Sequence, residues 1–241
     1  MKLRVGTLVP NTETPVGEGL NGATRAVIRI DGISHGAVIK RIPFPAVLAE
    51  CFCGILLRLW ELPTPEPVLI FDNGQVLFAS MDAGYPNLKK RLNWSDSLPE
   101  SQKQVLIGIC ARIVCNWSDL PRALAADEAI SNADRNLGNF LWDGTDHAYI
   151  DHERTLGLFP HLDNKIAQLA IIAQKQDHIE RAGIAAALTL DRGAPTRVVG
   201  DGLDFSTFVA HVERQLGVLA NLVLLRFPKP ADLLSGLQND Q

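Results

Sequence analysis

The segment SNADRNLGNFLWDGTDHAYIDHE, residues 131–153, carries side chains of the kinds that hold metal ions and phosphate. Asp134 and Asn139 lie five positions apart, and Asp151 directly follows the short apolar run HAYI. An aspartate and an asparagine at this interval can leave one loop toward the same phosphate. Because Mg²⁺ prefers a few hard oxygen ligands and completes its shell with phosphate and water, the segment predicts a metal–phosphate site.

The interval between Asp134 and Asn139 also has a known chemical use. In the loop H-R-D-x-x-x-x-N of protein kinases, the aspartate orients the acceptor hydroxyl and the asparagine binds metal. The aspartate of the kinase D-F-G triplet supplies a further metal contact, and the corresponding triplet here is Asp151-His152-Glu153. By this comparison Asp134 is a candidate catalytic residue, and Asn139 and Asp151 are candidate metal ligands.

Upstream residues could clamp a nucleotide phosphate. Lys40 ends the strand-like run HGAVIK, as the phosphate-binding lysine of kinases ends V-A-I-K, and Glu50 on the following helix is its expected ion-pair partner. Gly17, Gly19 and Gly22 form a G-x-G-x-x-G pattern between the first two predicted strands, where backbone N–H groups could approach phosphates. Each signal alone is weak, and their order along the chain is what favours a nucleotide site.

Other catalytic chemistries lack their motifs. None of the six histidines belongs to an H-E-x-x-H pair or to a cysteine cluster, so a zinc site is not expected. The sequence has no G-x-S-x-G for a serine hydrolase and no Walker A motif for a P-loop ATPase. The alternative that remains is structural: Asn132 and Asp134 could simply cap the end of a polar helix.

The composition is that of an ordinary globular protein of 241 residues, with 46% apolar residues and a net charge of −4. A nucleic-acid partner is not expected, since binding to a phosphate backbone usually shows a basic surplus. The first residues contain no apolar signal-peptide core, and no run approaches the roughly 18 apolar residues of a spanning helix. We therefore expect a cytoplasmic protein without a membrane partner. Its four cysteines lie in apolar stretches and are expected to be buried thiols.

An α+β framework is expected to bring the candidate residues together. Strands are predicted at 3–9, 24–30, 34–42, 68–71 and 75–80, with one helix over 46–60. Helical patterns follow at 101–117, 122–131, 162–188 and 204–238, interrupted by a hairpin of NFLWD and HAYID. The first forty residues are expected to form an antiparallel meander, and the apolar stretch 205–227 is expected to be one core helix.

Several of these motifs together resemble one family. The run NADRNLGN followed by YIDHE is similar to the D-R-H-x-x-N motif and the strand-end aspartate of the HipA-like kinases, which are related to the phosphoinositide-kinase-type fold. The upstream run LAECFCGILLRLWELPTPEPVLI is similar to their glutamate-bearing helix and the L-P-x-P connection after it. The resemblance spans residues 20–155, and the remainder resembles the family only in its helical pattern.

The resemblance implies a two-lobed protein-kinase-like fold, with a β-rich N-lobe over residues 1–82 and a mostly helical C-lobe over 83–241. It implies a phosphotransferase that uses ATP and Mg²⁺ and acts on serine or threonine of a protein substrate. Members of the family include toxins of toxin–antitoxin pairs, so an antitoxin-type protein partner is a further expectation.

The same resemblance assigns roles to individual residues. Asp134 would be the catalytic base, and Asn139 and Asp151 would bind the metal. Lys40 would bind phosphate while paired with Glu50.

Two positions depart from the family pattern. Asn136 stands where the family usually has histidine, and the triplet that begins at Asp151 reads D-H-E in place of D-F-G. Neither departure removes a candidate metal ligand. The competing hypothesis is a pseudokinase-like module that binds nucleotide or a partner without transferring phosphate.

Overall fold

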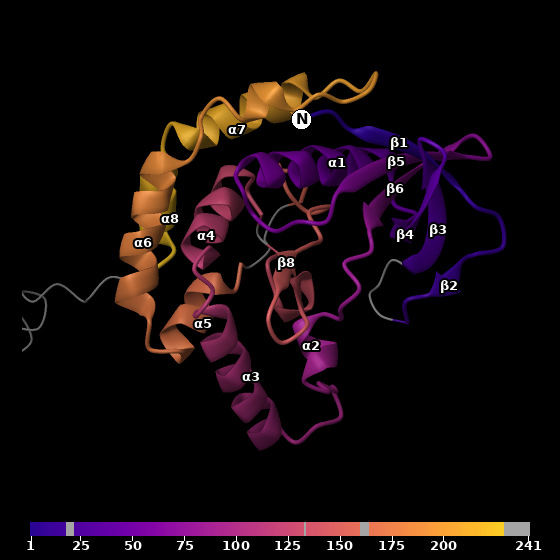
Figure 1. Ribbon diagram of the computed structural model, residues 1–241. Coiled ribbons are helices and arrows are strands. Elements are labelled where there is room, and N and C mark those ends of the chain that lie inside the picture. Colours follow the sequence, from indigo (N-terminus) through magenta and orange to yellow (C-terminus); the bar gives the residue numbers. More distant parts are fainter. Residues whose placement is uncertain (18–21, 133, 160–163, 229–241) are drawn as a thin grey trace, which may run out of the picture.

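The computed structural model describes residues 1–17, 22–132, 134–159 and 164–228 (Figure 1). The strands are β1 (Arg4–Leu8), β2 (Thr14–Pro15), β3 (Thr24–Ile30), β4 (Ile33–Lys40), β5 (Pro67–Asp72), β6 (Gln75–Met81), β7 (Phe140–Trp142) and β8 (His147–Tyr149). The helices are α1 (Phe44–Leu59), α2 (Leu88–Arg91), α3 (Glu100–Val114), α4 (Leu120–Ala129), α5 (Ile166–Ile172), α6 (Gln176–Thr189), α7 (Ser206–Leu216) and α8 (Leu219–Leu225). Two 3₁₀ turns, η1 (Leu137–Asn139) and η2 (Pro195–Arg197), complete the described elements. The chain is therefore mixed α and β, with most strands before residue 82 and most helices after it.

The six-stranded sheet has the order β1-β5-β6-β4-β3-β2, and β1 also pairs with β3. Five strands therefore close on themselves, and β2 extends one side. The β3–β4 and β5–β6 hairpins turn at Asp31-Gly32 and Asn73-Gly74, where all four residues have positive φ. Turns of this kind need residues that accept the left-handed region, and their twist matches that of the strands.

The inside of the curved sheet is a small apolar core. Its buried members are Ala26, Ile28, Ile30, Ala37, Ile39, Val68, Ile70, Leu77 and Ala79. They alternate along β3, β4 and β6 because successive side chains of a strand point to opposite faces. At Gly6 a Cβ atom would lie 3.1 Å from Ile30 and 3.2 Å from Ile70, so only glycine lets β1 approach this core without displacing it.

Helix α1 packs against β5 and β6 and lies beside them in Figure 1. It begins after Pro43 and carries a second proline in its first turn, where no intrahelical N–H bond is lost. Eleven of its residues, from Ala46 to Leu57, are buried, as expected of a helix that is apolar all round. Glu50 is among them, so the burial of α1 forces this carboxylate to find a partner inside the protein.

The helices after residue 100 pack around α4, which contacts α6, α7 and α8, while α3 contacts α5. Gly183 on α6 permits one of these contacts. A Cβ atom there would lie 3.1 Å from Val223 and 3.3 Å from Leu124. The apolar residues of this region join those of α1 in one continuous core. Cys51, Cys53, Cys110 and Cys115 are all buried free thiols, as the sequence predicts.

Two expectations about local structure were wrong. The first forty residues do not form a simple meander: β1 pairs in parallel with β5, and it meets β3 only through Thr7 and Leu8. The stretch 205–227 is two helices, α7 and α8, with a 70° bend between them. The break lies at Gly217-Val218, where the low helix propensity of glycine lets the chain turn.

In the described part of the chain, no single helix is long and apolar enough to cross a membrane. Among the described residues, one bent pair, α7 with α8, is together long and apolar enough to do so by length and composition.

Candidate active site

Lys40 and Glu50 form the first part of the site. Lys40 is the last residue of β4, and its Nζ lies 2.5 Å from Oε1 of Glu50 on α1. The other oxygen of Glu50, Oε2, accepts a hydrogen bond from the backbone N–H of His152 at 3.0 Å. Glu50 thus ties the end of the sheet to the segment that follows β8.

The two charges of this pair stabilise each other against burial. Burial by itself would lower the pKa of Lys40, but the carboxylates of Glu50 and Asp151 raise it above its usual value. Burial would likewise raise the pKa of Glu50, but Lys40 and contacts with His152 bring it down to about 2. Both groups are therefore charged at neutral pH. Removing either one would leave the other as a buried charge without a counter-ion, which is strongly destabilising.

We expect Lys40→Met to destabilise the fold by about 3 kcal/mol at pH 7, because it leaves the buried Glu50 carboxylate without its cation. In the wild type the ionisation of Glu50 contributes stability that is present above its ordinary pKa of 4.5 and is lost as the pH falls toward 2. Without Lys40, burial raises the pKa of Glu50, and protonation at lower pH relieves part of the cost. The difference between variant and wild type in urea unfolding should therefore be larger at pH 7 than at pH 4.

Glu50→Gln supplies the control for this pH dependence. In that background, Lys40→Met should lower the unfolding free energy by similar amounts at pH 7 and pH 4. Equal destabilisation by Lys40→Met at both pH values in the otherwise wild-type chain would contradict the assignment to Glu50.

Asp151 and Glu153 complete the surroundings of Lys40. Asp151 follows β8 with a φ of 69°, a left-handed conformation that aspartate and asparagine adopt more readily than most residues. Its Oδ1 lies 2.9 Å from Lys40 Nζ, and Oε2 of Glu153 lies 3.8 Å from the same atom. Oxygen atoms of Glu50, Asp151 and Glu153 all lie within 4.8 Å of one another. Three carboxylates from two distant segments therefore surround one ammonium group.

The loop from Asp134 to Asn139 forms the second part of the site. The backbone N–H of Asp134 donates to Oδ1 of Asn132 at 3.1 Å, and Nδ2 of Asn139 donates to the carbonyl of Asp134 at 2.6 Å. Since the amide nitrogen of Asn139 is engaged with the backbone, its Oδ1 is the atom left for a cation. The spacing of five residues thus closes one compact loop that presents both side chains.

Asn136 has a clear structural use in this loop. Its Oδ1 accepts from the backbone N–H of Gly138 at 2.8 Å and caps η1. Its Nδ2 lies 3.3 Å from Oδ1 of Asp134 and 3.2 Å from the carbonyl of the same residue. Asn136, which stands where the HipA-like kinases usually have histidine, therefore holds the Asp134 carboxylate in place.

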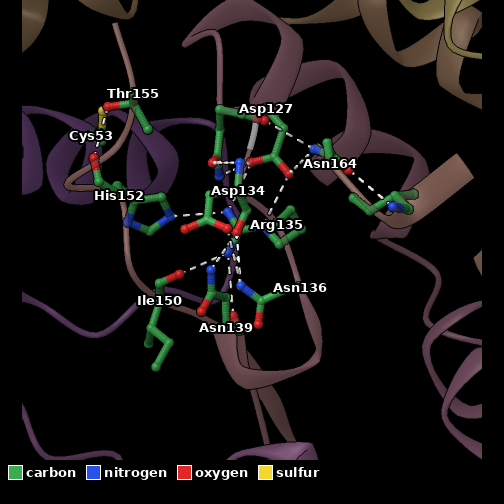
Figure 2. A network of polar contacts seen from close by, with 12 residues as sticks. Cys53, Asp127, Asp134, Arg135, Asn136, Asn139, Ile150, His152, Thr155 and Asn164 are labelled. Carbon is green, nitrogen blue, oxygen red and sulfur yellow. Dashed lines mark hydrogen bonds and ion pairs between the residues drawn. The ribbon is translucent and has the colours of Figure 1, made fainter. Parts of the chain in front are cut away.

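A fully buried arginine connects this loop to the Asp151 segment (Figure 2). Arg135 donates to both carboxylate oxygens of Asp127 on α4, at 2.8 and 3.0 Å. It also donates to the carbonyls of Asn139 at 3.3 Å and Ile150 at 2.8 Å. Its NH2 atom lies 3.1 Å from Nε2 of His152. One guanidinium thus fixes the relative position of the segments that carry Asn139 and Asp151.

The charge of Arg135 has a fixed partner. Burial by itself would lower the pKa of Arg135, but the Asp127 carboxylate more than offsets this. Because arginine has no acceptor, Nε2 of His152 must accept from it, so the ring proton lies on Nδ1, which is 3.6 Å from Oε2 of Glu50. His152 therefore links the buried Arg135–Asp127 pair to the Lys40–Glu50 pair.

The candidate residues line one cleft with a volume of about 910 Å³. Those that the sequence predicted and that line it are Lys40, Glu50, Asp134, Asn139 and Asp151. Other lining residues include Val16, Ala23, Phe78, Met81, Tyr85, Glu153 and Arg154. Residues more than one hundred positions apart in the chain therefore face the same space.

The described glycines of the predicted phosphate loop are not among the residues that line the cleft. Gly17 and Gly22 follow β2 and precede β3, with φ of 78° and 57°, and their neighbours Val16 and Ala23 line the cleft and share a backbone hydrogen bond of 3.0 Å. Gly19 lies outside the described residues. Val16 and Ala23 thus lie at the edge of the cleft, while Gly17 and Gly22 themselves do not line it.

Sequence reasoning did not identify Asp127, Glu153 and Arg154 as parts of this site. Glu153 and Arg154 directly follow the Asp151-His152 pair, so their position beside a predicted strand-end ligand was the available signal. The sequence held no such signal for Asp127, because a carboxylate within a helix usually faces water.

Comparison with solved structures supports the fold. No protein-family model matches the sequence, and no curated protein matches it. Among solved structures, the Helicobacter pylori proinflammatory kinase CtkA aligns with 94% of this chain and 97% of its own, with a TM-score of 0.53 and 12% identity. HipA of Shewanella oneidensis, solved with HipB and operator DNA, aligns over 92% of this chain and 69% of its own, with a TM-score of 0.57 and 10% identity. At identities this low, the structural similarity is evidence for the fold alone. The chain has the fold of the HipA-like kinases.

Proposed function

We propose that the chain is a Mg-ATP-dependent phosphotransferase that phosphorylates serine or threonine of a protein. The observation that carries this proposal is Lys40, which contacts Glu50 of α1 and Asp151 after β8 at the same time. A lysine held in this way beside a D-x₄-N loop is the arrangement that kinases use to bind and orient phosphate.

Each residue has one task in the proposed reaction. Lys40 binds the phosphates of ATP, and Asp134 accepts the proton of the acceptor hydroxyl. The acceptor oxygen then forms a bond to the terminal phosphorus while the bond from that phosphorus to the ADP oxygen breaks. Little covalent work is asked of the protein, because catalysis of this kind is mostly positioning and stabilisation of charge.

Asn139 and Asp151 are the residues that would hold Mg²⁺. Asn139 has its nitrogen engaged with the backbone of Asp134, so it offers an oxygen, and Asp151 offers a carboxylate. This oxygen-only set fits the preference of Mg²⁺, which takes its other ligands from phosphate and water. The metal would neutralise charge on the phosphates.

The proposal includes a two-lobed arrangement, with residues 1–82 as N-lobe and 83–241 as C-lobe around the cleft. It also includes a cytoplasmic location and an antitoxin-type protein partner. The last point is supported by the HipA structure, which was solved together with HipB.

We expect Mg-ATP to raise the melting temperature of the wild type by several degrees. A ligand at about 100 times its Kd stabilises by roughly 2.7 kcal/mol, which for a chain of this size corresponds to such a shift. Asp151→Asn should abolish the Mg-dependent part of the shift, because it removes a negative ligand. Asparagine tolerates the positive φ of this position, so the variant tests metal binding rather than backbone strain.

ATP with EDTA is the control for the metal. Absence of any shift in the wild type at millimolar Mg-ATP would rule out the active kinase and favour a module that works through partner contacts. An unchanged shift in Asp151→Asn would show that this carboxylate is not a metal ligand.

A further inference from the structure

Arg154 lies between the Lys40 cluster and Asp134. Its NH1 atom is 3.7 Å from Oδ2 of Asp134, and its Nε is 3.9 Å from Oε1 of Glu153. The other oxygen of Glu153 lies 3.8 Å from Lys40 Nζ. The buried Glu153 carboxylate therefore stands between two cations, of which one faces the candidate phosphate site and the other faces the candidate base.

The guanidinium of Arg154 is well suited to receive a further anion. Its distances to Asp134 and Glu153 are those of ion pairs and exceed the 2.7–3.2 Å typical of hydrogen bonds. The side chain is 35% exposed and lines the cleft. Its carbon Cζ lies 5.7 Å from the ring centre of Phe159, a cation–π contact that limits its orientation. Arginine offers five N–H donors in a planar fork that matches phosphate oxygens.

We propose that Arg154 binds the phosphoryl group while it is transferred from ATP to the acceptor, an inference that rests on the proposed phosphotransfer. The group must pass from the neighbourhood of Lys40 and Asp151 to a hydroxyl at Asp134. Arg154 has a carboxylate contact at each end of this path. In the transition state the bond to ADP breaks, the bond to the acceptor forms and the hydroxyl proton goes to Asp134, while the guanidinium stays protonated and balances charge on the three phosphoryl oxygens.

The same contacts give Arg154 a role before the reaction. Without a phosphoryl group, its nearest anion at the base is the Asp134 carboxylate. Phosphoryl oxygens carry more charge and accept two parallel N–H bonds, so they compete well for the fork. The arrival of the phosphoryl group would therefore draw Arg154 away and leave Asp134 available to the acceptor hydroxyl.

The test uses Mg-ADP alone and Mg-ADP with aluminium fluoride, which imitates a phosphoryl group in transit and needs no identified acceptor. In the wild type, aluminium fluoride should tighten the binding of Mg-ADP, measured by calorimetry. Arg154→Ala should bind Mg-ADP with unchanged affinity but lose about 100-fold of the added tightening, comparable to the loss of one strong transition-state donor. Arg154→Lys should recover part of it, because it restores the charge but lacks the fork.

Arg192→Ala is the matched control, since Arg192 is exposed and does not line the cleft. Melting temperatures without ligand establish that each variant is folded. Equal tightening in Arg154→Ala and the wild type, or none in the wild type, would overturn the role of Arg154 while leaving nucleotide binding intact. No binding of Mg-ADP by the wild type would instead overturn the proposed function itself.

Discussion

Asp134→Asn is expected to slow phosphotransfer by about 10²- to 10⁴-fold, the usual contribution of a positioned general base. The exchange keeps the size and most hydrogen bonds of the side chain but removes the oxygen that takes up the proton. Affinity for Mg-ADP should stay within about twofold, because Asp134 is assigned to the acceptor and not to the nucleotide. The measurement is the rate of γ-phosphate transfer from labelled ATP to a dephosphorylated protein extract, with Mg-ADP affinity determined in parallel.

Asp146→Asn is a matched control, as Asp146 is an exposed carboxylate in the β7–β8 turn that does not line the cleft. Full activity in Asp134→Asn would contradict its assignment as base. An equal loss of Mg-ADP affinity would indicate that the loop had rearranged. If neither protein transfers phosphate but both bind a partner equally well, the binding-module hypothesis is favoured.

The pairing of Lys40 with Glu50 was within reach of the sequence because both residues lie on short, strongly patterned elements. The apolar run that ends at Lys40 is typical of a strand, and the apolar pattern around Glu50 is typical of a helix. The likeness to kinase motifs assigned Asp151, which lies 111 positions beyond Lys40, to the same phosphate site, but the direct contact between the two side chains was not predicted. Periodicity alone carries no such long-range information.

Other features were not predictable because they depend on non-local contacts. The parallel pairing of β1 with β5 joins strands more than sixty residues apart, and nothing in either run distinguishes parallel from antiparallel partners. Asp127 on α4 resembles any helical carboxylate, and its meaning appears only when Arg135 is buried against it. Arg154 likewise gains a role only from the two carboxylates that fold around it.

Asp127→Ala should lower the free energy of unfolding by about 3 to 5 kcal/mol, because it leaves the fully buried charge of Arg135 without a counter-ion. Asp127 also accepts from Nδ2 of Asn132 and of Asn164, each at 2.9 Å, so two further donors would lose their partner. For a chain of this size the melting temperature should fall by about 10 °C. Urea unfolding of the ligand-free protein at pH 7 gives the measurement.

The exposed ion pair of Lys2 with Asp201, at 2.8 Å, provides the comparison, since Asp201→Ala should cost no more than about 1 kcal/mol. A double change of Asp127→Leu with Arg135→Met removes both buried charges and should recover part of the stability. It would still lack the bonds from Arg135 to the carbonyls of Asn139 and Ile150, so phosphotransfer should remain low. Recovery of stability together with full activity would mean that the buried pair only fills space. Low activity in a stable double variant would show that Arg135 positions the candidate metal ligands.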